Sequence, residues 1–123
     1  MTRKLINTLF VIACLASAPS LAEDGDIRGA GTASCGQWTA YRKPGDLLAA
    51  AFESWLMGYL SAFATFQEGG REILGGTDNM AFVGWVSNFC KAHPLDSINS
   101  AALALVTEMT RKATAAVHQH PQP

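Results

Sequence analysis

The longest regular pattern of apolar residues lies in the middle of the chain, between Leu47 and Phe66. Large apolar side chains recur there every three or four residues, which places them on one face of an α-helix. Asp46 precedes the run as an N-cap, and Gly69-Gly70 ends it. The pattern predicts one long helix that buries a broad stripe in a core, formed by Leu48, Phe52, Trp55, Tyr59, Phe63 and Phe66.

Two further stretches, one on each side of this run, have helical periodicity. A short helix is predicted in the segment ASCGQWTAYRK, after Thr32 as N-cap and before a Pro-Gly pair. The other covers about residues 79–92 and begins after Thr77 or Asp78. His93-Pro94 ends it, because proline disfavours helical geometry in the residue before it.

The last predicted helix begins after Asp96 or Ser97, with an inward stripe at Ile98, Ala102, Leu105 and Met109. The glycine-rich segment QEGGREILGGTDN, between the long run and the 79–92 helix, is predicted to be a linker with a small apolar anchor. No segment alternates apolar and polar residues with the period of a strand. The fold class is therefore all-α, a compact small bundle of about four helices.

The first 22 residues have the three parts of a cleaved secretory signal peptide. Arg3 and Lys4 form a positive start, residues 5–18 are mostly apolar, and Ser20-Leu21-Ala22 supplies small residues before the cleavage point. The remaining chain divides into a flexible lead-in at 23–31, a helical domain at 32–116 and a disordered tail at 117–123. We expect a periplasmic or secreted protein of a Gram-negative envelope.

A second interpretation of the same segment involves Cys14. The sequence Val-Ile-Ala-Cys at residues 11–14 resembles a lipobox, which would make Cys14 the lipid-modified first residue of the mature chain. We favour cleavage after Ala22, since the small-residue site there is well formed. Mass spectrometry of the mature N-terminus distinguishes the two.

Signal cleavage would leave two cysteines, Cys35 and Cys90, in a protein exported to an oxidising compartment. Pairing them is the simplest outcome, and it would add stability to a domain of about one hundred residues. Zinc sites usually need four Cys or His ligands at short spacings, and no such spacing occurs. A nucleophilic Cys90 is disfavoured because His93 precedes a proline and leaves the helix that carries the cysteine. We predict a Cys35–Cys90 disulfide.

Small residues recur every fourth position in the long apolar run, at Ala50, Ser54, Gly58 and Ala62. Such a row lets another helix approach closely, either as a groove within the protein or as a contact in a homodimer. We favour the intramolecular groove. The run is also long enough to cross a membrane, but Glu53 would be costly there, so we predict a buried core helix and no integral span.

The chain offers little for catalysis or cofactor binding. It has nine basic and ten acidic residues, with no basic patch to recruit nucleic acid. His93, Asp96 and Ser97 have the residue types of a hydrolase triad, but they lie too close together around a proline to adopt its geometry. We predict a protein that is not an enzyme, holds no cofactor or metal, and works by binding protein clients or a protein partner.

The segments SCGQW, WLMGYLSAF and WVSNFCKAHPL, followed by an Ala-rich last helix, resemble small periplasmic proteins of the HdeA/HdeB type. That resemblance implies a helical fold, one disulfide and activity as an acid-activated chaperone, with Cys35 and Cys90 as the matching pair. In acid, charge repulsion would loosen the bundle and expose a client surface that we place at Phe52, Phe63, Phe82 and Trp85.

A second resemblance is to the Tai-type immunity proteins of type VI secretion, carried by GYLSAF and HPLDSINSAALALVTEM. It implies a helical exported protein that binds and neutralises a toxic hydrolase. Those proteins place a cysteine beside the Gly-Tyr motif, where this chain has Met57. A third interpretation is that the protein is a structural subunit of a cell-envelope complex.

Overall fold

The computed structural model of the protein describes residues 26–119. The predicted signal peptide, Cys14 and the end of the predicted tail lie outside this range, so they stay predictions. Every regular element within it is helical: η1 (a 3₁₀ turn, Gly29–Thr32), α1 (Cys35–Ala40), α2 (Leu47–Phe66), α3 (Gly70–Leu74), α4 (Asn79–Ala92) and α5 (Ile98–Gln119). The prediction of a small all-α bundle is confirmed.

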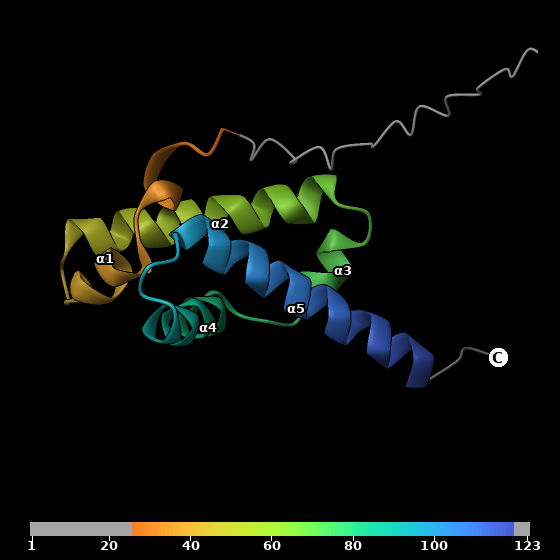
Figure 1. Ribbon diagram of the computed structural model, residues 1–123. Coiled ribbons are helices and arrows are strands. Elements are labelled where there is room, and N and C mark those ends of the chain that lie inside the picture. The colour runs from red at the N-terminus through yellow and green to blue at the C-terminus, as the bar shows by residue number, and fades with distance from the viewer. Residues whose placement is uncertain (1–25, 120–123) are drawn as a thin grey trace, which may run out of the picture.

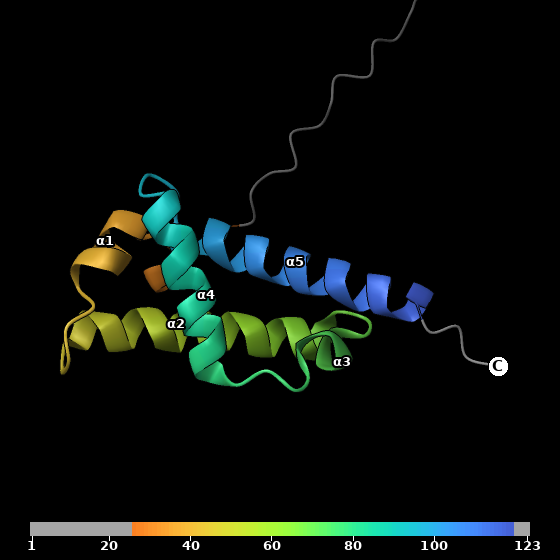
Figure 2. The same cartoon turned by 90° about the horizontal axis from the view of Figure 1, so that it is seen from below.

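The two long helices, α2 and α5, run along the length of the molecule and contact each other (Figure 1). Helix α4 crosses them on one side, with α1 beside it near its C-terminal end (Figure 2). The short helix α3 packs against both α2 and α5, and η1 contacts the same two helices. The core therefore lies between α2, α4 and α5.

The helix starts follow side-chain capping. Asp46 caps α2 by accepting a hydrogen bond from the Leu48 backbone N–H at 2.8 Å, as predicted. Asp78, one of the two predicted candidates, caps α4 in the same way. The predicted cap of α1, Thr32, is wrong, since Ser34 takes that role in a capping box with Gln37.

Three predicted loop segments are more ordered than the sequence indicates. The glycine-rich linker contains α3, in which Leu74 is buried and serves as the apolar anchor. The end of the predicted flexible lead-in forms η1, where Gly31 is buried against the Trp55 ring. Helix α5 continues to Gln119, three residues into the segment predicted to be a disordered tail.

The predicted stripe of α2 is only partly buried. The line that enters the core is Phe52, Leu56 and Leu60, spaced four residues apart. Leu48 and Phe66, which were expected to join it, are exposed at the two ends of the helix. In α5 the predicted inward stripe is confirmed, because Ile98, Ala102 and Leu105 are buried and Met109 packs against the core.

The small-residue row of α2 is open to solvent along most of its length. Ala50, Ser54, Gly58 and Ala62 are all exposed. A Cβ added at Gly58 would meet no atom within 4 Å. The expected intramolecular groove does not extend along the whole row: Ala50 and Ser54 border a hollow shared with Asn79 and Val83 of α4, and nothing lies over Gly58.

Helix α2 also has the length and apolar composition of a membrane-crossing helix, the only one within residues 26–119 that does. Core helices of water-soluble proteins share these properties, so composition alone is weak evidence. Three residues of α2 are buried, which makes it a core helix along one line and an exposed helix elsewhere. The absence of a membrane span stays a prediction.

Replacing Gly58 by alanine tests the exposure of this row. We expect Gly58→Ala to stabilise the protein by about 0.5–1 kcal/mol, because alanine costs less conformational entropy in a helix and the site is open. Chemical denaturation measures the change. Gly70→Ala is the matched control and should destabilise, since its Cβ would lie 2.4 Å from the Phe63 carbonyl oxygen. A destabilising Gly58→Ala would mean that the row is packed.

Candidate functional site

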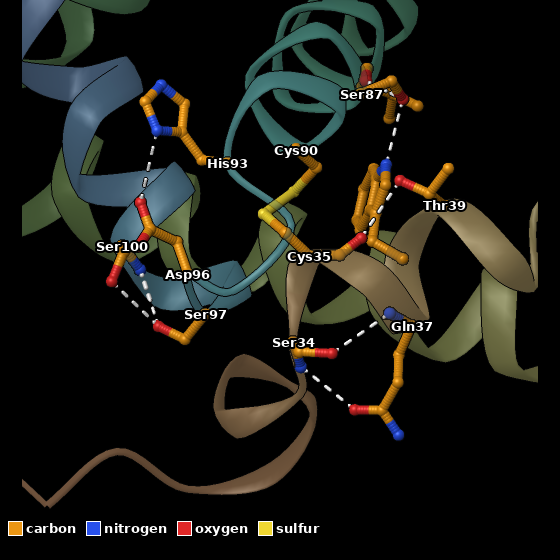
Figure 3. Close-up of a disulfide and its surroundings, with 12 residues drawn as sticks. Ser34, Cys35, Gln37, Thr39, Ser87, Cys90, His93, Asp96, Ser97 and Ser100 are labelled. Atoms are coloured by element: carbon orange, nitrogen blue, oxygen red, sulfur yellow. Dashed lines mark hydrogen bonds and ion pairs between the residues drawn. A yellow bond between two sulfur atoms is a disulfide. The ribbon is translucent and has the colours of Figure 1, made fainter.

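A disulfide joins the first helix to the fourth, as predicted. Cys35 at the start of α1 and Cys90 near the end of α4 are bonded, with their Cα atoms 4.6 Å apart (Figure 3). Both side chains are buried, at 0% and 1% exposure. A buried, paired cysteine has no free thiolate for nucleophilic or redox chemistry. The bond therefore serves to fix the relative positions of α1 and α4.

Backbone hydrogen bonds extend this tie to the start of α5. The Cys35 N–H donates to the Asp96 carbonyl oxygen at 2.7 Å, and the Gly36 N–H donates to that of Pro94 at 2.9 Å. In return the Ile98 N–H donates to the Ala33 carbonyl oxygen at 2.9 Å. The α4–α5 connection is thus bound along the segment that begins α1, which sets the direction in which α5 leaves.

Trp38 fills the space beneath the disulfide. Its side chain is fully buried and stacks on Phe52 of α2, with ring centroids 6.3 Å apart. The indole Nε1–H donates to the Ser87 hydroxyl of α4 at 3.0 Å. The Arg42 guanidinium lies over the ring, 4.9 Å from its centroid, and pairs with Glu53 of α2 at 2.8 Å. One side chain therefore connects α1, α2 and α4.

A groove runs along α5 beside this rigid junction, and we call it the α4–α5 groove. Its volume is about 830 Å³. The floor is one face of α5 that follows helical spacing, at Ser97, Ser100, Leu103, Ala104, Thr107, Glu108 and Arg111. Trp85 and Phe89 of α4 form one wall, and the segment with Ile27, Gly31 and Thr32 forms the other.

The α4 wall is a row of stacked rings. Trp85 and Phe89 stack at a centroid distance of 5.7 Å, and Phe89 stacks on His93 at 4.4 Å. Trp85 and Phe89 are only partly buried, and Leu103 opposite them on the floor is 54% exposed. This middle part of the groove therefore presents apolar surface that nothing among the described residues covers.

The two ends of the groove differ in charge. The end near the start of α5 carries Ser97, Asn99 and Ser100, which are uncharged. At the other end Arg111 donates two hydrogen bonds of 2.9 Å to Glu108, and the Lys112 ammonium lies 3.4 Å from the same carboxylate. These donors lower the pKa of Glu108, and the carboxylate in turn raises the pKa of Arg111. Two cations against one anion leave this end positive.

The predicted client surface is divided between the core and the groove. Phe52 and Phe82 are each 5% exposed and belong to the core. Phe63 is partly buried on α2, and Trp85 alone of the four lines the groove. The folded protein therefore does not present these four side chains as one surface.

Leu103 and Arg111 are the groove residues that sequence reasoning missed. The signal was present, because Leu103 is an apolar residue that falls outside the inward stripe of its own helix. An apolar residue on a polar helix face is common, so the pattern alone does not mark a binding site. Only the position of α4 places the Trp85 and Phe89 rings beside it.

No protein-family model, curated protein or solved structure matches this chain. The resemblances to HdeA/HdeB and to the Tai-type immunity proteins therefore stay predictions. No group of three His, Cys, Asp or Glu side chains between residues 26 and 119 is placed to hold a metal ion. The α4–α5 groove is the feature of the described structure that best fits a binding role.

Proposed function

We propose that this is a non-catalytic, exported protein that binds another protein through the α4–α5 groove. The observation that carries the proposal is the exposed apolar surface of Trp85, Phe89 and Leu103 inside a groove of about 830 Å³. Grooves with aromatic walls and a polar rim are typical of sites that recognise a partner. The partner would be a toxic hydrolase in an immunity protein, or a neighbouring subunit in an envelope complex.

The construction of the groove supports binding of a folded partner at neutral pH. One wall and the floor meet where the disulfide and the three backbone hydrogen bonds between residues 33–36 and 94–98 hold α1, α4 and α5 together. A preformed surface loses little conformational entropy on binding, so more of the contact energy appears as affinity. The disulfide also requires an oxidising compartment, in agreement with export.

Photo-crosslinking from the groove tests this proposal. A benzoylphenylalanine at position 103 should crosslink one protein in envelope extracts of the native cells, because this side chain lies in the open part of the groove. The same amino acid at position 47 is the matched control, since Leu47 is 85% exposed on α2, whose residues do not line the groove. Trp85→Ala should abolish the product formed from position 103. Absence of any product from position 103 would contradict the proposal.

Acid-activated chaperone activity is a second candidate, and the burial of Phe52 and Phe82 supports it. Such side chains would bind clients only after the bundle loosens, which gives a protein that is inactive at neutral pH. Because the pKa of Glu108 is lowered in the folded protein, its ionised carboxylate stabilises the fold at pH values above the ordinary pKa of glutamate. This contribution is lost as the pH falls below about 4. The Glu108 side chain is 30% exposed and its ion pairs lie at the surface, so the loss of this contribution alone would not unfold the protein.

An aggregation assay separates the two candidates. An acid-labile client is incubated with an equimolar amount of the protein at about pH 2–3, and scattering is followed after neutralisation. A chaperone would suppress the scattering, and Leu103→Asp would leave the suppression intact because the exposed core provides the surface. A groove-binding protein would leave client aggregation unchanged. Suppression that disappears in Leu103→Asp would contradict the acid-exposed core.

A further inference from the structure

We propose that the occupant of the α4–α5 groove is an amphipathic helix of the partner protein, with an acidic side chain about two turns from its apolar anchor. The anchor would lie between Leu103 and the Trp85–Phe89 wall, and the carboxylate would lie on Arg111. This inference rests on the proposed function and adds the chemistry of the partner.

The shape of the groove fits a helix. Its floor extends from Ser97 to Arg111, about 21 Å at the rise of an α-helix, which is the length of a partner helix of about 14 residues. The floor residues recur at three- and four-residue spacing, so the floor is a continuous face of α5. An amphipathic helix laid in a groove between helices is an established recognition mode.

Backbone hydrogen bonding also favours a helix over an extended segment. The floor and the α4 wall are helices, whose N–H and C=O groups are already paired within each helix. An extended peptide pairs its backbone most fully at an open sheet edge, and the lining of the groove offers none. A helical segment arrives with its backbone bonds already made, so burying it leaves fewer polar groups without partners.

The charged end of the groove selects an acidic side chain. Arg111 and Lys112 outnumber Glu108, and Glu108 engages two of the five N–H groups of the Arg111 guanidinium. The Arg111 side chain is 67% exposed, so its other N–H groups can reach a second carboxylate. Charge complementarity of this kind fixes the orientation of a bound helix, because Ser97, Asn99 and Ser100, which line the opposite end, are uncharged.

The distance along the floor sets the spacing in the partner. Leu103 and Arg111 are eight residues apart, which corresponds to about 12 Å along the axis of α5. A helix that lies beside α5 covers the same distance in seven or eight residues. The partner should therefore carry apolar residues at positions i and i+4 and an acidic residue at i+7.

Two blocked, alanine-based helical peptides of 15 residues test the inference against the full mature protein. Both carry leucine at positions 4 and 8, and they differ only in glutamate or glutamine at position 11. We expect both to shift the amide NMR signals of Trp85 and Leu103, and the glutamate peptide to bind about five times more tightly. Arg111→Gln should remove this preference and leave the affinity of the glutamine peptide unchanged. Arg71→Gln changes an exposed arginine outside the groove and should retain the preference for the glutamate peptide.

Each other outcome contradicts the inference in a distinct way. Equal binding of the two peptides overturns the acidic recognition. Shifts elsewhere on the protein, or no binding at millimolar peptide, overturn the helical occupant, and the crosslinking from position 103 still decides the proposed function separately. A crosslink from position 103 to a second copy of the chain would identify a self-contact in place of a different partner.

Discussion

Replacing both disulfide cysteines by alanine should lower the free energy of unfolding by about 4 kcal/mol. The bond closes a loop between residues 55 apart in sequence, and the estimate is the loop-closure entropy that the unfolded chain regains when the bond is absent. Small domains are commonly stable by only about 5–15 kcal/mol, so this loss would leave Cys35→Ala/Cys90→Ala only marginally folded at growth temperature. Urea denaturation followed by circular dichroism measures the difference.

Reduction of the unmodified protein is the control for this prediction. Dithiothreitol should shift its denaturation midpoint to that of the double variant, and should leave the variant itself unchanged. A loss of less than about 1 kcal/mol in both experiments would show that the hydrogen bonds between residues 33–36 and 94–98 hold the junction without the covalent bond. A loss of stability in the double variant but not in the reduced protein would indicate a packing defect around the two alanines.

The second large effect is expected at Trp38. Trp38→Ala should cost about 3–5 kcal/mol, because it opens a cavity at a fully buried position and removes the contacts to Phe52 and Ser87 together. Trp38→Phe should cost about 1–3 kcal/mol, since it retains most of the apolar volume. The Ser87 hydroxyl still donates to the Val83 carbonyl oxygen in both variants. Thermal and chemical denaturation give the values.

Trp85→Ala is the matched control, because it makes the same chemical change at a partly buried position in the groove wall. It should cost about 1 kcal/mol and leave the fold intact. Equal losses at the two tryptophans would contradict the division between a structural ring at the junction and an available ring in the groove.

Much of the fold follows from local rules that act along the sequence. The three- and four-residue spacing of apolar side chains between Leu47 and Phe66 predicts α2, and Asp46 and Asp78 start their helices through one side-chain hydrogen bond each. The pairing of Cys35 and Cys90 follows from the prediction that the third cysteine, Cys14, is removed with a signal peptide. These features need no knowledge of where other elements lie.

The wrong predictions concern segments whose structure depends on contacts with other elements. A glycine-rich segment favours a loop, yet Leu74 is drawn into the core and α3 forms around it. Gly31 belongs to a segment without helical pattern, and it is ordered because the Trp55 ring lies against it. The row through Gly58 has the spacing of a packing groove, but only its first half borders α4, and nothing lies over Gly58. A pattern of residues along one helix does not identify which element packs against it.

The candidate site is the least predictable part for the same reason. Trp85 was predicted as part of a client surface, whereas Leu103 and Arg111 were given no role. The groove exists because α4 lies across α5 (Figure 2), in the position that the disulfide junction holds. Its chemistry therefore depends on a contact between residues more than fifty positions apart in the sequence.

The exchange of backbone hydrogen bonds between residues 33–36 and 94–98 has a consequence for biosynthesis. The first helix finds the acceptors for its Cys35 and Gly36 amides about sixty residues downstream, and Ile98 closes the same contact. A nascent chain shorter than this cannot complete that junction, however many helices it has already formed. Oxidation to the native bond should accordingly be a late event, and ribosome-stalled chains that end before residue 98 should remain accessible to thiol-alkylating reagents.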